Sequence, residues 1–299
     1  MVPISILTKL LQECGGVEVI AQCLGPVMEW VGLPGSMGLV WASAILTNLY
    51  GGVVAFAALA PAHELTVAQV TVLSTIILVA HALPIELRIA QKAGTRFRIM
   101  ILIRVLGALL LGFILNQLYT QTGWLQEPAQ CLWTLTASDP TWKAWALNEL
   151  HTYLIIFAII VALLLLLRIL EAIGVIDLLT RLLNPLLVQL GIGREAAPLT
   201  MIGMTMGITY GGGLIIKESQ SGRIGSRDVF FSLTLLGLAH SLIEDTLVVL
   251  ALGAHTSGVL WARLLFSILV VALMVRILRS VSDESFNRYF MRSTQPDPA

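Results

Sequence analysis

The chain has 299 residues, of which 57% are hydrophobic and only 12% are charged, and its formal net charge is zero. Soluble domains carry roughly 25% charged residues, so this composition, with a mean hydropathy of +0.87, indicates a protein of the lipid bilayer. The balanced charge and the lack of a long basic block argue against nucleic acid as a partner. Three scattered cysteines without a Cys-x-x-Cys pair predict neither a disulfide framework nor a zinc site.

Seven apolar stretches follow along the chain. A helix needs about 20 apolar residues to cross a bilayer core of about 30 Å. Five stretches meet this test as predicted spans: Val67–Ala90, Ile99–Leu118, Leu150–Ile173, Val229–Leu252 and Val259–Leu278. Two others, Gly35–Leu59 and Ala196–Ile216, are interrupted by glycines, and each contains Tyr-Gly-Gly.

Lysine and arginine concentrate in a few connecting segments, which the positive-inside rule places in the cytoplasm. These are Arg88–Arg98, followed closely by Arg104, then Lys217–Asp228, and the tail after Arg276. The segment Tyr119–Asn148 has one lysine and several tryptophans, so it is predicted to lie outside, at the membrane interface.

A full crossing by Ala196–Ile216 would put these basic segments on opposite sides of the membrane. A re-entrant hairpin, which enters and leaves on the cytoplasmic side, removes the conflict. Irregular backbone at membrane depth is tolerated where protein or a water-filled cavity satisfies it.

The two halves of the chain share an order of features at an offset of about 160 residues. Each has an amphipathic run with a proline and a glycine six positions later, then the broken stretch with Tyr-Gly-Gly, then Ala-His inside a span. An acidic residue follows each histidine by five positions: Glu86 after His81, and Asp245 after His240. Agreement at these residue types is much less expected by chance than agreement at Leu or Val, so the sequence predicts an internal repeat.

Corresponding loops of the two halves differ in charge. The loop after the His81 span is basic, whereas its counterpart Gly253–Gly258 has no Lys or Arg; the relation is reversed for the loops before the two spans. We therefore predict an inverted-topology repeat, in which broken helices at matching places mark a transport site. The first half lacks most of the span that would match Leu150–Ile173, because the chain begins there. A partner or a second protomer could complete it, which suggests a homodimer.

The amphipathic helix, proline, glycine-broken hairpin with Tyr-Gly-Gly and following span resemble the Gate, or nucleoside-recognition, domain. This domain is shared by concentrative nucleoside transporters, the ferrous-iron permease membrane domain and the spore-maturation proteins A and B. The resemblance covers nearly the whole chain as two copies and is specific for membrane architecture rather than for substrate. The expected location is the bacterial inner membrane, and the basic tail predicts a cytoplasmic C-terminus.

The predicted fold is an all-α polytopic membrane protein. It has two inverted-topology repeats, each with an interfacial helix, a re-entrant hairpin and two spans, plus one extra span. Residues 1–118 form the first Gate-like repeat, 119–148 an external Trp-rich interfacial loop, 149–278 the second repeat and 279–299 a cytoplasmic tail.

The broken stretches hold the predicted substrate-binding residues, because half-helix ends expose free N–H and C=O groups and nearby hydroxyls set specificity. The alternative is that small residues there only allow close helix packing. These residues are Thr47, Asn48, Tyr50, Gly51, Gly52, Thr205, Thr209, Tyr210, Gly211 and Gly212.

A second set of residues is predicted to act in coupling or gating, since ionisable groups inside a membrane are functional candidates by default. His240 and Glu244 are four apart and are expected to share one helix face, where they could relay protons or bind a divalent metal. Pro84 is expected to kink the His81 span, and Glu86 to lie at its cytoplasmic surface. The coupling or gating candidates are His81, Glu218, His240, Ser241, Glu244 and Asp245.

The predicted function is a secondary-type permease for a small polar solute, with nucleoside-like compounds among the candidates and the substrate site between the two hairpins. The alternatives are a non-transporting membrane scaffold or assembly factor, in which polar clusters only lock helices together, and a divalent-metal permease. No nucleophile–base–acid set, Walker sequence or dinucleotide fingerprint occurs, so neither an enzyme nor a bound cofactor is expected. The expected partners are the lipid bilayer and a small-molecule or ion substrate.

Overall fold

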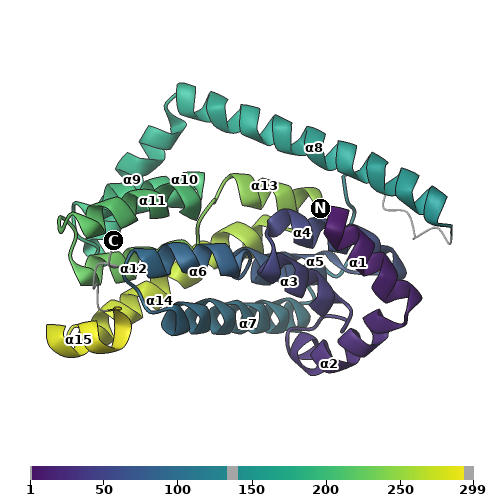
Figure 1. Ribbon diagram of the computed structural model, residues 1–299, viewed down its shortest axis with the longest axis horizontal. Coiled ribbons are helices and arrows are strands. Elements are labelled where there is room, and N and C mark those ends of the chain that lie inside the picture. The colour runs from purple at the N-terminus through teal and green to yellow at the C-terminus, as the bar shows by residue number, and fades with distance from the viewer. Residues whose placement is uncertain (1, 133–140, 293–299) are drawn as a thin grey trace, which may run out of the picture. The chain divides into compact units, whose positions relative to one another are not determined.

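The computed structural model describes residues 2–132 and 141–292, and its elements in this part of the chain are all helical (Figure 1). The predicted all-helical architecture is therefore confirmed. Two compact units are present: unit 1 comprises Met1–Leu83, Ala108–Leu167 and Glu244–Trp261, and unit 2 comprises Pro84–Gly107, Arg168–Ile243 and Ala262–Ala299. Each unit thus takes one segment from the other half of the sequence.

The helices follow the apolar pattern of the sequence. In chain order they are α1 (Val2–Glu13), α2 (Gly16–Trp30), α3 (Met37–Leu46), α4 (Leu49–Leu59), the 3₁₀ turn η1 (Ala60–Ala62), α5 (Val67–Val79), α6 (Leu83–Lys92), α7 (Phe97–Thr122), α8 (Trp142–Ala172), α9 (Val175–Gln189), α10 (Ala196–Met206), α11 (Ile208–Gln220), α12 (Ser226–Leu238), α13 (Glu244–Ala251), the π-helical turn η2 (Ser257–Ala262), α14 (Arg263–Leu278) and α15 (Asp283–Phe290).

Four helical segments in the described residues are long and apolar enough to cross a membrane: Val67–Lys92, Phe97–Thr122, Trp142–Ala172 and Ser257–Leu278. They match four of the five predicted spans. The fifth, Val229–Leu252, is interrupted, because the helix stops at Leu238 and resumes at Glu244. The matched span over Val67–Ala90 is interrupted in the same way, between Val79 and Leu83, so the prediction of a continuous helix is wrong for both.

The same local geometry recurs once in each unit. In unit 1, Gly15 adopts φ +68° before α2, which contains Pro26, and Gly32 ends that segment at φ +75°. In unit 2, Gly174 adopts φ +80° before α9, and Gly191 follows that helix at φ +89°. Positive φ is accessible to glycine without a Cβ penalty, which explains why both segments begin and end on glycine.

Each unit next contains a hairpin of two short helices, α3 with α4 and α10 with α11, so the glycine-interrupted stretches are broken as predicted. A Cβ atom at Gly52 would lie 2.9 Å from Cβ of Ala44, and one at Gly211 would lie 2.3 Å from Cα of Gly203. The two helices of each hairpin therefore approach so closely that only glycine fits.

This packing predicts that Gly211→Ala lowers the free energy of unfolding by about 1–3 kcal/mol, the usual cost of overpacking. Gly213→Ala is the matched control on the same helix, because a Cβ atom there meets nothing within 4 Å. The control should be neutral or gain up to about 1 kcal/mol from helix propensity. Melting curves of the two purified variants in detergent distinguish them, and equal midpoints would contradict the close approach.

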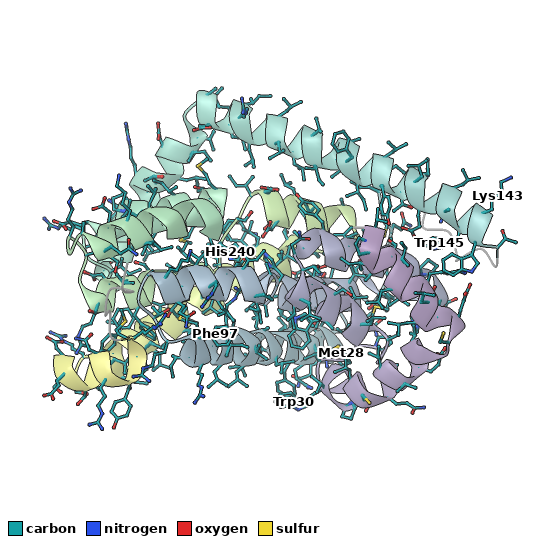
Figure 2. The ribbon with its side chains drawn as sticks, viewed as in Figure 1. Met28, Trp30, Phe97, Lys143, Trp145 and His240 are labelled. Atoms are coloured by element: carbon teal, nitrogen blue, oxygen red, sulfur yellow. The ribbon has the colours of Figure 1, made fainter. Side chains whose placement is uncertain are left out.

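The segment between α7 and α8 is shorter than the predicted interfacial loop, because α8 already begins at Trp142. Trp142 and Trp145 stack edge to face in its first turn, beside Lys143 (Figure 2). Trp133 lies outside the described residues. The thiol of Cys131 donates to the Leu252 carbonyl at 3.1 Å, and burial raises the pKa of this thiol to about 11.

The three basic segments that the charge pattern assigns to one side of the membrane meet in unit 2. The amide of Arg96, between α6 and α7, donates to the Phe290 carbonyl at 3.0 Å, and the amide of Arg292 donates to the Gly94 carbonyl at 2.7 Å. Ser219, at the end of α11, donates to the Ala93 carbonyl at 3.0 Å. These bonds place the α6–α7 turn, the α11–α12 segment and the C-terminal helix α15 side by side.

Candidate functional site

Two helices break at the sequence Ala-His with nearly identical geometry. Ala80 leaves α5 at φ −136° and ψ 72°, and Ala239 leaves α12 at φ −146° and ψ 64°. The residue after each histidine has positive φ, with +48° at Ala82 and +49° at Ser241. Positive φ is uncommon for residues other than glycine, and such backbone strain persists where the surrounding structure enforces it, often at functional sites.

Hydrogen bonds hold each break against the hairpin of its own unit. The amide of Ala82 donates to the Ala44 carbonyl at 2.9 Å in unit 1, and that of Leu242 donates to the Met204 carbonyl at 2.8 Å in unit 2. Ala44 and Met204 lie in the first helix of their hairpins, close to its end. The strained backbone is therefore fixed to the hairpin by a direct bond in both units.

Both break histidines are buried and oriented in the same way. Nδ1 of His81 lies 3.0 Å from the Ile77 carbonyl, and Nδ1 of His240 lies 2.7 Å from the Leu236 carbonyl. A carbonyl only accepts, so each Nδ1 carries a proton and donates it. Nε2 of each ring is left as the atom that accepts a hydrogen bond or takes up a second proton.

In unit 1, Nε2 of His81 faces a carboxylate of α13. It lies 3.7 Å from Oδ2 of Asp245, and both residues are buried. The neighbouring Glu244 accepts a hydrogen bond of 2.7 Å from the hydroxyl of Tyr50, in the second helix of the hairpin α3–α4. Unit 1 therefore joins a hairpin tyrosine, a break histidine and two carboxylates.

In unit 2, Nε2 of His240 faces Glu86 of α6, with 3.2 Å to Oε1. Oε2 of the same carboxylate accepts from Arg104 of α7, and Glu86 and Arg104 are 6% and 1% exposed at their side chains. Arg263 of α14 is fully buried and donates to the carbonyls of Leu238 and His240 at the helix break. A buried ion pair and a second arginine thus hold the His240 break.

The two histidine–carboxylate pairs are exchanged between the halves of the sequence. Asp245 follows His240 by five positions yet pairs with His81, and Glu86 follows His81 by five positions yet pairs with His240. Each pair lies within one compact unit. Each helix break thus has a buried imidazole that faces a carboxylate of its own unit.

The structure corrects several expectations about these residues. His240 and Glu244 do not share a helix face, because residues 239–243 are not helical and the residues belong to different units. Glu86 is buried rather than at the surface, because it pairs with Arg104 and His240. The His81 helix breaks before Pro84, which lies in the first turn of α6, where its missing N–H leaves no hydrogen bond unmade. Arg263 was missed, although its offset of 159 residues from Arg104 is a usable signal.

Most predicted substrate-binding side chains of the first hairpin, and Thr205 of the second, have local partners. Thr47 donates to the Ser43 carbonyl at 2.6 Å, Asn48 caps α4 by accepting from the Gly51 amide at 3.0 Å, and Thr205 donates to the Met201 carbonyl at 3.0 Å. A Cβ atom at Gly51 would lie 2.1 Å from the Thr47 hydroxyl oxygen.

The remaining predicted site residues of the second hairpin lie in α11. A Cβ atom at Gly212 would lie 2.5 Å from Cγ2 of Ile89. The side chains of Thr209 and Tyr210 lie outside the described part of the structure. Glu218 forms an ion pair of 3.1 Å with the exposed Arg223 at the end of α11. Tyr50 is a predicted substrate-binding side chain that the structure brings to a predicted coupling residue, Glu244.

These features define an all-helical integral membrane protein with two broken helices. The chain is similar to an uncharacterized membrane protein of Bacillus subtilis strain 168, YvoD, with 26% identity over 276 residues. The similarity covers 90% of this chain and 86% of that relative. No protein-family model matches the chain, and no solved structure matches it.

Proposed function

We propose that the chain is a secondary-type permease for a small polar solute in a bacterial inner membrane. The observation that carries the proposal is the pair of matching helix breaks with exchanged histidine–carboxylate pairs. Discontinuous helices at corresponding places of two repeats are the best pointer to a transport site. Buried ionisable groups in a membrane are costly, and they mark substrate or ion pathways.

The proposed membrane arrangement is an inverted-topology repeat with two re-entrant hairpins, similar to Gate domains. The hairpin helices have 10–13 residues, which corresponds to roughly 15–20 Å and is short of a bilayer core of about 30 Å. A hairpin of such helices can enter and leave on one side. The meeting of the three basic segments in unit 2 supports a common, cytoplasmic side for them, with the C-terminus there.

The proposed coupling groups in unit 1 are His81, Asp245 and Glu244, with Tyr50 linking them to the hairpin. Protonation of His81 at Nε2 would strengthen its attraction to Asp245, and deprotonation would weaken it. A solute that competes with Glu244 for the Tyr50 hydroxyl would therefore bind at a site whose charge depends on whether His81 is protonated. No chemical step on the solute is required, so we propose a transporter and not an enzyme.

The test is a thermal-shift screen of the purified protein with nucleosides, bases, transition-metal ions and small acids. A permease is expected to be stabilised by one class of small polar compound, because binding to the folded state raises its unfolding midpoint. A transition-metal ion that binds saturably in calorimetry would instead favour the divalent-metal permease. A persistent protein partner in pull-down, with no stabilising compound at all, would favour the scaffold and contradict the proposal.

A further inference from the structure

A cavity of about 690 Å³ lies in unit 2 where the three basic segments meet. Its walls come from the α6–α7 turn, from the segment between α11 and α12, and from the end of α15. Ligand sites for small molecules typically measure roughly 300–1,000 Å³, so the cavity has the size of a binding site.

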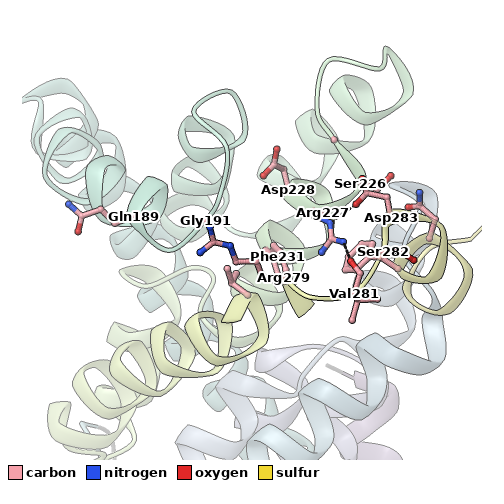
Figure 3. Close-up of a pocket in the computed structure, with 14 residues that line it drawn as sticks. Gln189, Gly191, Ser226, Arg227, Asp228, Phe231, Arg279, Val281, Ser282 and Asp283 are labelled. Atoms are coloured by element: carbon pink, nitrogen blue, oxygen red, sulfur yellow. Dashed lines mark hydrogen bonds and ion pairs between the residues drawn. The ribbon is translucent and has the colours of Figure 1, made fainter. Parts of the chain in front are cut away.

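Among the residues that the structure describes, the charged side chains that line this cavity are all positive. They are Arg96, Arg288 and Arg292, and no Asp or Glu within residues 2–132 or 141–292 is among the lining residues. A neighbouring cavity of about 870 Å³ makes the contrast clear (Figure 3). There Arg227 and Arg279 are balanced by Asp228 and Asp283, and Arg227 donates to Asp283 at 2.8 Å.

Backbone carbonyls hold Arg96 of the smaller cavity. Arg96 donates through Nε to the Met291 carbonyl at 3.0 Å and through Nη2 to the Arg288 carbonyl. The antiparallel bridge between Thr95 and Met291 fixes the same two segments. Carbonyls orient a guanidinium without neutralising its charge, so the lining keeps its positive charge.

Helix α15, which contributes Asn287 and Arg288 to the lining, is suited to a membrane surface. Phe286 of α15 is buried against Phe230 of α12, with ring centroids 5.5 Å apart, whereas Tyr289 of α15 is 62% exposed. Basic pockets beside membrane helices on the cytoplasmic side bind anionic headgroups. Guanidinium groups match phosphate oxygens in bidentate geometry.

We propose that this cavity, defined by Arg96, Arg288 and Arg292, binds a phosphate group, supplied by the headgroup of an anionic phospholipid or by free phosphate. The site is separate from the helix breaks and does not depend on transport. It would attach the C-terminal helix α15 to the α6–α7 turn through a shared anion.

The test measures the melting midpoint of the full-length protein in detergent with added phosphatidylglycerol, phosphatidylcholine or inorganic phosphate. If phosphatidylglycerol alone raises the midpoint, the ligand is a lipid headgroup. If inorganic phosphate raises the midpoint, the ligand is a free anion. Either result supports the site. Equal effects of phosphatidylglycerol and phosphatidylcholine, with none from phosphate, would overturn it.

The variant Arg288→Gln/Arg292→Gln is expected to weaken binding of the stabilising anion by about tenfold or more, because it removes charged hydrogen-bond donors. Arg96 is left in place, since its backbone bonds support the fold. Arg223→Gln is the matched control: it removes one charge from the same basic region, but Arg223 pairs with Glu218 and does not line the cavity. Unchanged binding by the double variant, or an equal loss in the control, would overturn the proposal. If the double variant melts early without ligand, Arg292→Gln alone provides the same comparison.

Discussion

Glu86→Gln is expected to lower the free energy of unfolding by about 3–5 kcal/mol, the cost of leaving a buried charge without its partner. The carboxylate of Glu86 accepts from Arg104 and faces Nε2 of His240, and all three side chains are buried. Removing its charge takes away the carboxylate that pairs with the Arg104 guanidinium in unit 2. The measurement is the midpoint of thermal or denaturant unfolding of the purified protein in detergent.

Two further variants test whether the loss of stability comes from the Glu86–Arg104 pair or from the removal of any charge. Glu64 is exposed, so Glu64→Gln should change the unfolding free energy by less than about 0.5 kcal/mol. The double variant Glu86→Gln/Arg104→Gln should be less destabilised than the sum of the single variants, because neither charge is then stranded. A loss below about 1 kcal/mol in Glu86→Gln would show that the pair is not buried in the folded protein.

Asp245→Asn is expected to abolish the pH dependence of solute movement while leaving the protein folded. Asp245 faces His81 at 3.7 Å in unit 1, and the amide keeps the size of the carboxylate but cannot attract a protonated imidazole. Uptake by proteoliposomes, with a compound that stabilises the wild-type protein, measures this effect. The rate at the optimal pH should fall by about tenfold or more, the factor that corresponds to 1.4 kcal/mol.

Tyr50→Phe provides the matched comparison within the same unit. It removes the hydroxyl that donates to Glu244 at 2.7 Å and leaves the His81–Asp245 pair intact. We expect weaker solute binding with a retained pH profile. If Asp245→Asn and Tyr50→Phe had the same effect on binding and on pH dependence, the distinct roles assigned to the two residues would be wrong.

Much of the fold could be predicted because its signals are local. Length and hydropathy located four spans, and the glycine-interrupted stretches located both hairpins. The helix break at His240 was not predicted, since Val229–Leu252 is long and apolar enough for a single span and nothing near Ser241 signals positive φ. The break depends on tertiary bonds, such as that of the Leu242 amide to the Met204 carbonyl, which lie 38 positions apart in the chain.

The residues of the candidate site could be predicted from local signals, but their tertiary partners could not. The sequence identified His81, His240, Glu244 and Asp245 as ionisable groups inside apolar segments, and their type and depth were sufficient for that. It could not identify their partners, because helical spacing was assumed between His240 and Glu244. The exchange of Glu86 and Asp245 between the halves is a tertiary pairing, and no spacing rule within one helix predicts it.

The most direct test of the proposed function is uptake by proteoliposomes under an imposed pH gradient, with the compound that most stabilises the purified protein. The wild-type protein is expected to accumulate the compound above its external concentration, and Asp245→Asn is expected to bind it without accumulating it. If wild-type proteoliposomes take up no more of the compound than protein-free liposomes do, the chain is not a permease for it and the transport proposal is contradicted.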